Sequence, residues 1–298
     1  MRRPGIPPAP ADGKSLTLRD LHCSVFHAVY PYYFEVWGQT RRVLSREGEK
    51  LLLERPWTVP PQTGCQVAVG TGFYRNLIVG NHTPDGMTGI QLWISCVENV
   101  IAGNTIARQR KPGLYLYANG TTLASSMPRE WNRGVSPLFW NLAEGNRTEE
   151  CSAGALVTSG DEGRLPIEFP RALGNVLRHN SFIRNRTDGV VLSSRGTPQG
   201  ITDTSASIIG TITEFNVVRD AQVAYHAGHS TDGVVFRRNH AYFWYPVSLA
   251  TNAPVAFQRD DLKTTMTLEK NSIEGLHGVH DHRTIDLCQP DGNVKLPE

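Results

Sequence analysis

The feature that most constrains this chain is an internal repeat. The hexamer at residues 76–81 (NLIVGN) recurs 23 residues later at 99–104 (NVIAGN). Looser copies follow, and the asparagines that close all the copies are Asn81, Asn104, Asn146, Asn180, Asn216, Asn239 and Asn271. The steps between them are 23, 42, 34, 36, 23 and 32 residues, which indicates a unit near 23 residues that carries loop insertions of variable length.

Each unit holds short apolar runs separated by turns, which predicts strands rather than helices. The runs after the hexamers begin at Gly89, Gly113, Gly154, Gly189 and Gln222. Helical repeats need about 33–47 residues and a 3.6-residue period, and neither is seen. Because one unit cannot bury its apolar face alone, the units must stack, with equivalent residues about 4.8 Å apart.

The repeated asparagines have a structural interpretation in such a stack. An asparagine at the same corner of every coil can adopt the left-handed backbone conformation. Its side-chain amide can also bond the next asparagine along the stack, which builds an inward ladder. We therefore predict that all seven asparagines are structural.

The pattern N-x-I-x-G-N-x-I followed by G-I-x-L resembles the right-handed parallel β-helix of the pectate-lyase-like superfamily, over residues 70–275. The resemblance implies an all-β solenoid of about seven to nine coils. Members include polysaccharide lyases, hydrolases, epimerases, tail-spike depolymerases and non-catalytic surface proteins. It implies an extracellular or cell-surface protein whose polysaccharide or oligosaccharide partner lies across the glycine-led strands. The chain lacks the Asn-Thr-Asp and Trp-Ile-Asp-His motifs of two member types, so the reaction is not identified.

Four segments are expected along the chain. Residues 1–14 read as a flexible start, 15–69 as an N-terminal cap or hairpin segment, 70–275 as the β-helix and 276–298 as a polar C-terminal cap. The runs at 38–44 and 50–54 flank a Gly-containing turn, which predicts a hairpin, and the following prolines end it. Residues 15–37 fit an incomplete first coil or a cap, because an open solenoid edge must be covered.

Composition narrows the classes of partner. The net charge of +2 does not imply a nucleic-acid partner, and no run of about 18 apolar residues exists to span a membrane.

The start shows no signal peptide, and its abrupt Arg- and Pro-rich composition also fits a fragment of a longer β-helix. The five cysteines are scattered, which argues against a zinc knuckle. Stacking could gather dispersed acids around calcium, but the sequence itself supports no cofactor. We expect a monomer or a trimer.

Period-two alternation gives the directions of side chains on the glycine-led strands. One outward column is predicted to read Trp93, Tyr117, Thr158, Ser193, His226, and its neighbour Ser95, Asn119, Gly160, Arg195, Gly228. Aromatic faces suit the apolar face of a pyranose ring. The candidate substrate-binding residues are Gln91, Trp93, Tyr115, Tyr117, Asn119 and His229. The alternative is that Trp93 and Tyr117 simply pack under the insertion at 118–136.

Three functions remain open at this point. A uronate lyase needs a cation for the substrate carboxylate and a base for the neighbouring proton; Arg195 and His226 fit these roles, with His229 or Tyr225 as acid. A hydrolase needs paired carboxylates, and Asp188 and Asp220 precede equivalent strands in our alignment. The third function is a non-catalytic carbohydrate-binding or structural β-helix. Solvated surface side chains and local turn caps explain the same residues without catalysis.

Overall fold

The computed structural model describes residues 15–17, 43–47, 50–57, 73–93, 96–119, 138–160, 172–193, 208–228, 231–244, 255–259, 266–275, 283–287 and 294–295. Within these residues every regular element is a β-strand. None of them forms a helix long and apolar enough to cross a membrane. The chain divides into two compact units, which we describe separately.

The first unit contains a three-stranded antiparallel sheet in the order β1-β3-β2. Its strands are β1 (Ser15–Thr17), β2 (Val43–Glu47) and β3 (Lys50–Leu53). Glu47 pairs with Lys50 across the turn, which confirms the predicted hairpin. Strand β1 pairs antiparallel with β3, so Ser15–Thr17 belongs to the same sheet as the hairpin. The predicted flexible start at 1–14 and residues 18–37 lie outside the described residues.

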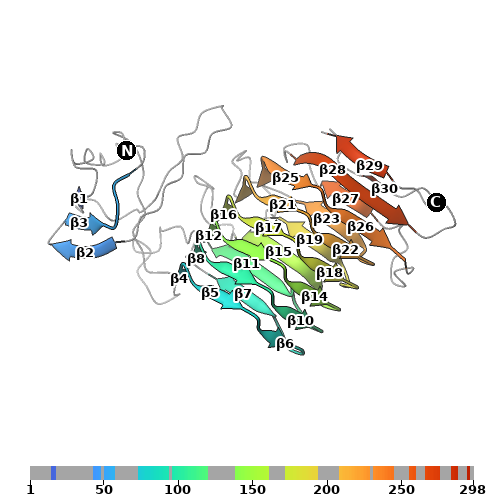
Figure 1. Ribbon diagram of the computed structural model, residues 1–298, viewed down its shortest axis with the longest axis horizontal. Helices are drawn as coiled ribbons and strands as arrows, with labels where there is room; N and C mark the ends of the chain where they lie inside the picture. The colour runs from blue at the N-terminus through green and yellow to red at the C-terminus, as the bar shows by residue number, and fades with distance from the viewer. Residues whose placement is uncertain are drawn as a thin grey trace. The chain divides into compact units, whose positions relative to one another are not determined.

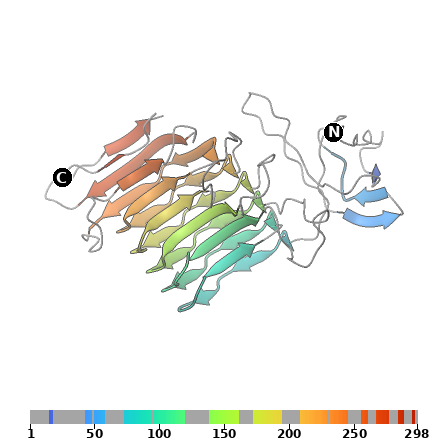
Figure 2. The same cartoon turned by 180° about the vertical axis from the view of Figure 1, so that it is seen from behind.

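The second unit is a right-handed parallel β-helix, and its strands stack rung on rung (Figures 1 and 2). Six short strands form the short-strand sheet: β4 (Phe73–Tyr74), β8 (Cys96–Val97), β12 (Leu138–Phe139), β16 (Ala172–Leu173), β20 (Ile208–Ile209) and β24 (Thr231–Asp232). Six others form the parallel part of the long-strand sheet: β7 (Ile90–Trp93), β11 (Leu114–Asn119), β15 (Ala153–Gly160), β19 (Asp188–Leu192), β23 (Val223–Ala227) and β27 (Val255–Arg259).

The third sheet, which we call the bent sheet, has two arms that meet at β28 (Met266–Gly275). The first arm contains β5 (Leu77–Val79), β9 (Val100–Ala102), β13 (Leu142–Glu144), β17 (Val176–Arg178), β21 (Ile212–Glu214) and β25 (Val234–Arg237). The second contains β6 (His82–Thr83), β10 (Thr105–Ala107), β14 (Arg147–Glu149), β18 (Ser181–Ile183), β22 (Val217–Arg219) and β26 (His240–Phe243). Two late strands, β29 (Arg283–Leu287) and β30 (Val294–Lys295), pair antiparallel with β28 and β27. In the described residues, the six strands of each arm and the shared strand β28 make seven rungs. This number lies within the seven to nine coils that we expected.

The predicted asparagine ladder is confirmed at all seven positions. Each side-chain nitrogen donates to the side-chain oxygen one rung on, from Asn81 to Asn104 at 2.9 Å through Asn239 to Asn271 at 3.1 Å. The same oxygen also accepts the backbone N–H of the preceding asparagine, as Asn216 Oδ1 does from Asn180 at 2.9 Å. Every rung is therefore joined to the next at this corner.

The left-handed backbone conformation, which we predicted for the ladder asparagines, occurs one residue earlier. It belongs to the residue before each ladder asparagine, with φ between 50° and 67°: Gly80, Gly103, Gly145, His179, Phe215, Arg238 and Lys270. That residue turns the chain at the corner, and the asparagine after it points inward. Asparagine is needed here for its amide and not for its tolerance of positive φ.

A second ladder, which the sequence analysis missed, runs along the preceding corner. Asn76, Asn99, Asn141 and Asn175 are joined in series by side-chain hydrogen bonds of 2.8–3.0 Å. The residue before each of these asparagines again has positive φ. Two corners of the coil are thus fixed by amide stacks.

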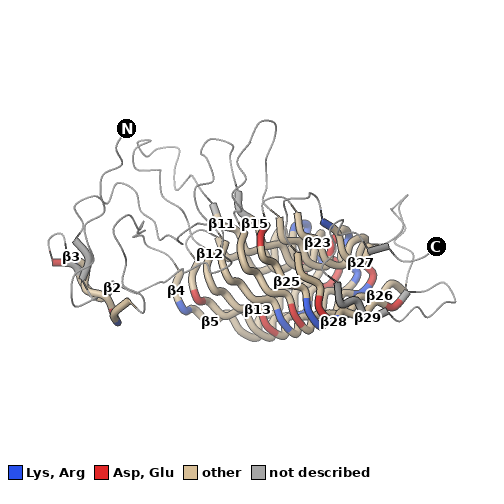
Figure 3. Tube along the Cα trace, turned by 90° about the horizontal axis from the view of Figure 1, so that it is seen from above, with Lys and Arg blue, Asp and Glu red and all other residues tan. Residues whose placement is uncertain are grey.

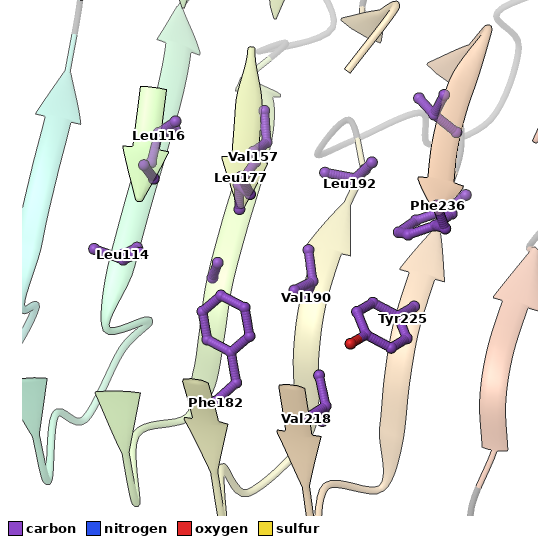
Figure 4. Close-up of a cluster of buried hydrophobic side chains, with 14 of the residues drawn as sticks. Leu114, Leu116, Val157, Leu177, Phe182, Val190, Leu192, Val218, Tyr225 and Phe236 are labelled. Atoms are coloured by element: carbon purple, nitrogen blue, oxygen red, sulfur yellow. The ribbon is translucent and has the colours of Figure 1, made fainter. Parts of the chain in front are cut away.

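The interior is filled by side chains that alternate along the strands (Figure 4). Leu114, Leu116, Val190 and Leu192 are fully buried. Each stabilises the fold by about 1.5–3 kcal/mol on burial. The glycine that leads each run has a packing reason, since a Cβ at Gly154 would lie 2.5 Å from the Phe182 ring.

Charged side chains alternate along the outside of the first arm, as the red and blue bands of Figure 3 show between β13 and β28. Arg178 binds both carboxylate oxygens of Glu144 at 2.9 and 3.2 Å. Arg237 binds Glu214 at 2.6 Å. Exposed pairs contribute only about 0–1 kcal/mol each. Their positions agree with the register that the asparagine ladders impose.

Replacing a central ladder residue should destabilise the solenoid. In the variant Asn180→Ala, the buried N–H of Asn146 and the carbonyl of Ala143 lose their partners. We expect the free energy of unfolding to fall by about 2–4 kcal/mol in chemical denaturation. The matched variant Asn81→Ala, at the exposed first rung, should cost about 1 kcal/mol or less. Equal losses would contradict a ladder that depends on burial.

The thiol of Cys96 should be protected in the native state. Burial raises its pKa to about 11, whereas an unfolded thiol has a pKa of about 8.5. The native state therefore binds more protons between these values, so stability from this group falls as the pH rises through that window. At about pH 8 its thiolate fraction should be about 240-fold below that of the unfolded chain. Alkylation followed by peptide mass spectrometry measures this, and rapid native labelling at Cys96 would contradict it.

Candidate functional site

The outward face of the long-strand sheet holds five of the predicted site residues: Gln91, Trp93, Tyr115, Tyr117 and His226. Strand pairing places Gln91, Tyr115, Leu156, Val191, His226 and Gln258 in one column. Trp93, Tyr117 and Thr158 form the next column. The predicted inward and outward directions on β7 are confirmed, because Ile90 and Leu92 are buried while Gln91 and Trp93 are exposed.

Three aromatic side chains gather at the early rungs of this face. The ring centroids of Trp93 and Tyr117 lie 6.4 Å apart, and those of Tyr115 and Tyr117 lie 5.5 Å apart, both in tilted arrangements. Trp93 keeps 52% of its surface exposed, whereas Tyr115 keeps 8%. Trp93 is thus the residue of this cluster that offers a free aromatic face.

His226 contacts a carboxylate at the later rungs. Its Nδ1 lies 3.3 Å from Oδ1 of Asp188, and the two side chains keep only 17% and 16% of their surface exposed. Asp188 begins β19 and His226 lies on the neighbouring strand β23. A carboxylate beside one imidazole nitrogen favours the tautomer that carries its proton on that nitrogen. Both residues were predicted from the sequence as site residues, but for different reactions.

The register of β23 corrects the predicted column. We expected His226 opposite Ser193, but its Cα partner is Val191, two residues earlier. The alignment matched Gln222 to Gly189, whereas this pairing places Ala224 beside that glycine. Because the error is an even number of residues, His226 still faces outward. It joins the column of Gln91 and Tyr115 and not that of Trp93.

The two carboxylates proposed for a hydrolase do not occupy equivalent positions. The Cα partner of Asp188 is Val223, three residues after Asp220. Asp220 instead lies at a corner with φ of 55° and is 6% exposed. Its Oδ1 accepts a hydrogen bond from the backbone N–H of Trp244.

Tyr225 lies inside the solenoid. It is fully buried, its ring stacks on Phe257 at 5.1 Å, and its hydroxyl donates to the carbonyl oxygen of Asn216 at 3.0 Å. Burial raises the pKa of this phenol well above its ordinary value. Asn119 lies on β11 with Gly160 as its Cα partner. Arg195 and His229 lie outside the described residues, as do the tail histidines His277, His280 and His282.

A second polar cluster, absent from the sequence predictions, lies on the bent sheet. His240 lies between Ser272 and Glu274 on the neighbouring strand, and its ring stacks on Tyr242. A signal for it was available, because His240 and Ser272 each follow a ladder asparagine directly. Residues at that step of the repeat share one outward column: His82, Thr105, Arg147, Ser181, Val217, His240 and Ser272.

No group of three or more His, Cys, Asp or Glu side chains in the described part of the chain is arranged to hold a metal ion. Comparison of the chain with models of known protein families, with curated proteins and with solved structures finds no match.

Proposed function

We propose that this protein is a carbohydrate-active member of the pectate-lyase-like superfamily that cleaves an extracellular or cell-wall polysaccharide of uronic acids by β-elimination. The observation that supports this most is the contact between Asp188 and His226, on the sheet face that also presents Trp93. The stacked parallel fold with its asparagine ladders is the second support.

The proposed chemistry uses His226 as the base. Asp188 on Nδ1 favours the tautomer with its proton there, so Nε2 takes the proton from the carbon beside the uronate carboxylate. Arg195, which follows β19 in the chain, is the proposed cation for that carboxylate. Elimination then breaks the bond to the leaving oxygen, and His229 is the proposed acid. The buried hydroxyl of Tyr225 has no role in this scheme.

The aromatic cluster is the proposed sugar platform. Tyr115 and His226 share a column and are separated by three strand steps, or about 14 Å. A chain lying along this column would contact the rings at one end and the base at the other. Flat aromatic surface with a polar edge suits the apolar face of a pyranose.

The lyase is tested with a panel of uronate polymers, following the ultraviolet absorbance of the unsaturated product. His226→Ala should lower kcat by at least about 100-fold, because it removes the base. Asp188→Asn should lower kcat less and shift the pH profile. His82→Ala, an exposed histidine on β6, is the matched control. Unchanged cleavage in His226→Ala would contradict the proposed base.

The second candidate is a non-catalytic carbohydrate-binding protein, which the exposed face of Trp93 favours. Trp93→Ala should weaken glycan binding by about 3–10-fold, the loss expected for one ring contact, measured by calorimetry. Phe215→Ala, an exposed aromatic residue on another corner, is the control. Binding without cleavage would select this candidate, and neither binding nor cleavage across the panel would overturn the proposed function.

A further inference from the structure

His240 on β26 is held between two side chains of β28. Its Nδ1 lies 2.5 Å from Oγ of Ser272, and its Nε2 lies 3.7 Å from Oε2 of Glu274. The register fixes both contacts, because His240 pairs with Ser272 and Tyr242 pairs with Glu274. Ile273, between the two partners, is 2% exposed and anchors this part of β28 in the core. Hydroxyl, imidazole and carboxylate therefore lie in sequence on a rigid sheet.

Aromatic and cationic groups surround the imidazole. The ring of Tyr242 stacks on that of His240 with centroids 3.8 Å apart and planes 25° apart. This stack restrains the orientation of the imidazole. The guanidinium of Arg219 lies 5.6 Å from the centroid of the Tyr242 ring. The ring centroids of Tyr242 and Trp244 lie 6.4 Å apart. Trp244 is 46% exposed.

We propose that Ser272, His240 and Glu274 form an acyl-transfer site that hydrolyses esters of small carboxylic acids. His240 Nδ1 takes the proton of Ser272 Oγ as that oxygen bonds the ester carbonyl carbon. Glu274 stabilises the imidazolium that results. Collapse of the tetrahedral intermediate breaks the bond to the alcohol oxygen, which takes the proton from His240. Water then attacks the acyl-serine through the same base, and the carboxylic acid and free Ser272 are restored.

The surroundings indicate the class of substrate. In this scheme Arg219, whose guanidinium lies 5.6 Å from the Tyr242 ring, supplies the positive charge for the oxygen that gains negative charge. The faces of Tyr242 and Trp244 suit a ring-shaped alcohol such as a sugar. The substrate class is therefore an O-acyl ester carried by a ring alcohol. This site lies on the bent sheet and does not depend on the proposed lyase face.

The chain contains an internal comparison. Ser181 occupies the same outward column three rungs before Ser272, but its Cα partners are Arg147 and Val217. Ser181 is half-buried, as Ser272 is, and neither of its Cα partners is a histidine. A serine at this step of the repeat does not require the contact that Ser272 makes.

The test uses the full chain with two probes. A fluorophosphonate, which modifies activated serines covalently, is expected to label Ser272, as located by peptide mass spectrometry. Hydrolysis of p-nitrophenyl acetate should fall at least about 100-fold in Ser272→Ala and His240→Gln. Ser181→Ala should change neither reading, and circular dichroism confirms the fold of each variant.

The outcomes separate this proposal from the lyase. Labelling at Ser272 that persists in His226→Ala supports an independent acyl-transfer site. Absence of label at Ser272 in the unmodified chain overturns the proposal, whatever the variants show. Equal ester hydrolysis by a folded Ser272→Ala variant overturns it as well.

Discussion

Hydrogen bonds between stacked asparagine amides are the interaction on which the rest of this structure depends. A carboxamide donates and accepts at once, so each asparagine binds the rung on either side and also satisfies a buried backbone N–H. A buried donor left without a partner costs about 1–3 kcal/mol. Because two corners are fixed in this way, the strands between them have one register, and the alternating charges outside agree with it.

A fixed register explains how distant residues meet. Asp188 and His226 are separated by more than a full repeat, and His240 and Ser272 by 32 residues. Each pair lies on neighbouring strands, so strand spacing and not loop folding brings them together. Side chains on packed strands hold their positions more closely than side chains on loops. Both proposed sites use this property on different sheets.

The repeat allowed the fold, the hairpin and the main ladder to be predicted, because seven asparagines at one step leave few other structures. Directions on β7 followed from alternation. The column of His226 did not, because the loops between strands vary in length, and the predicted alignment of β23 is two residues out of register. The pair of Asp188 with His226 and the cluster around His240 depend on that register. The second ladder was visible at Asn76 and Asn99 but was not interpreted as one.

The most direct test of the register is a cross-link between β19 and β23. Neighbouring parallel strands bring Cα atoms within the range that a disulfide spans. Cysteines introduced together as Val191→Cys and His226→Cys should oxidise to a disulfide joining positions 191 and 226, identified by peptide mass spectrometry. The pair Ser193→Cys with His226→Cys should oxidise far more slowly. Preferential linkage of 193 with 226 would contradict the register that the ladders impose, and with it the site built on that register.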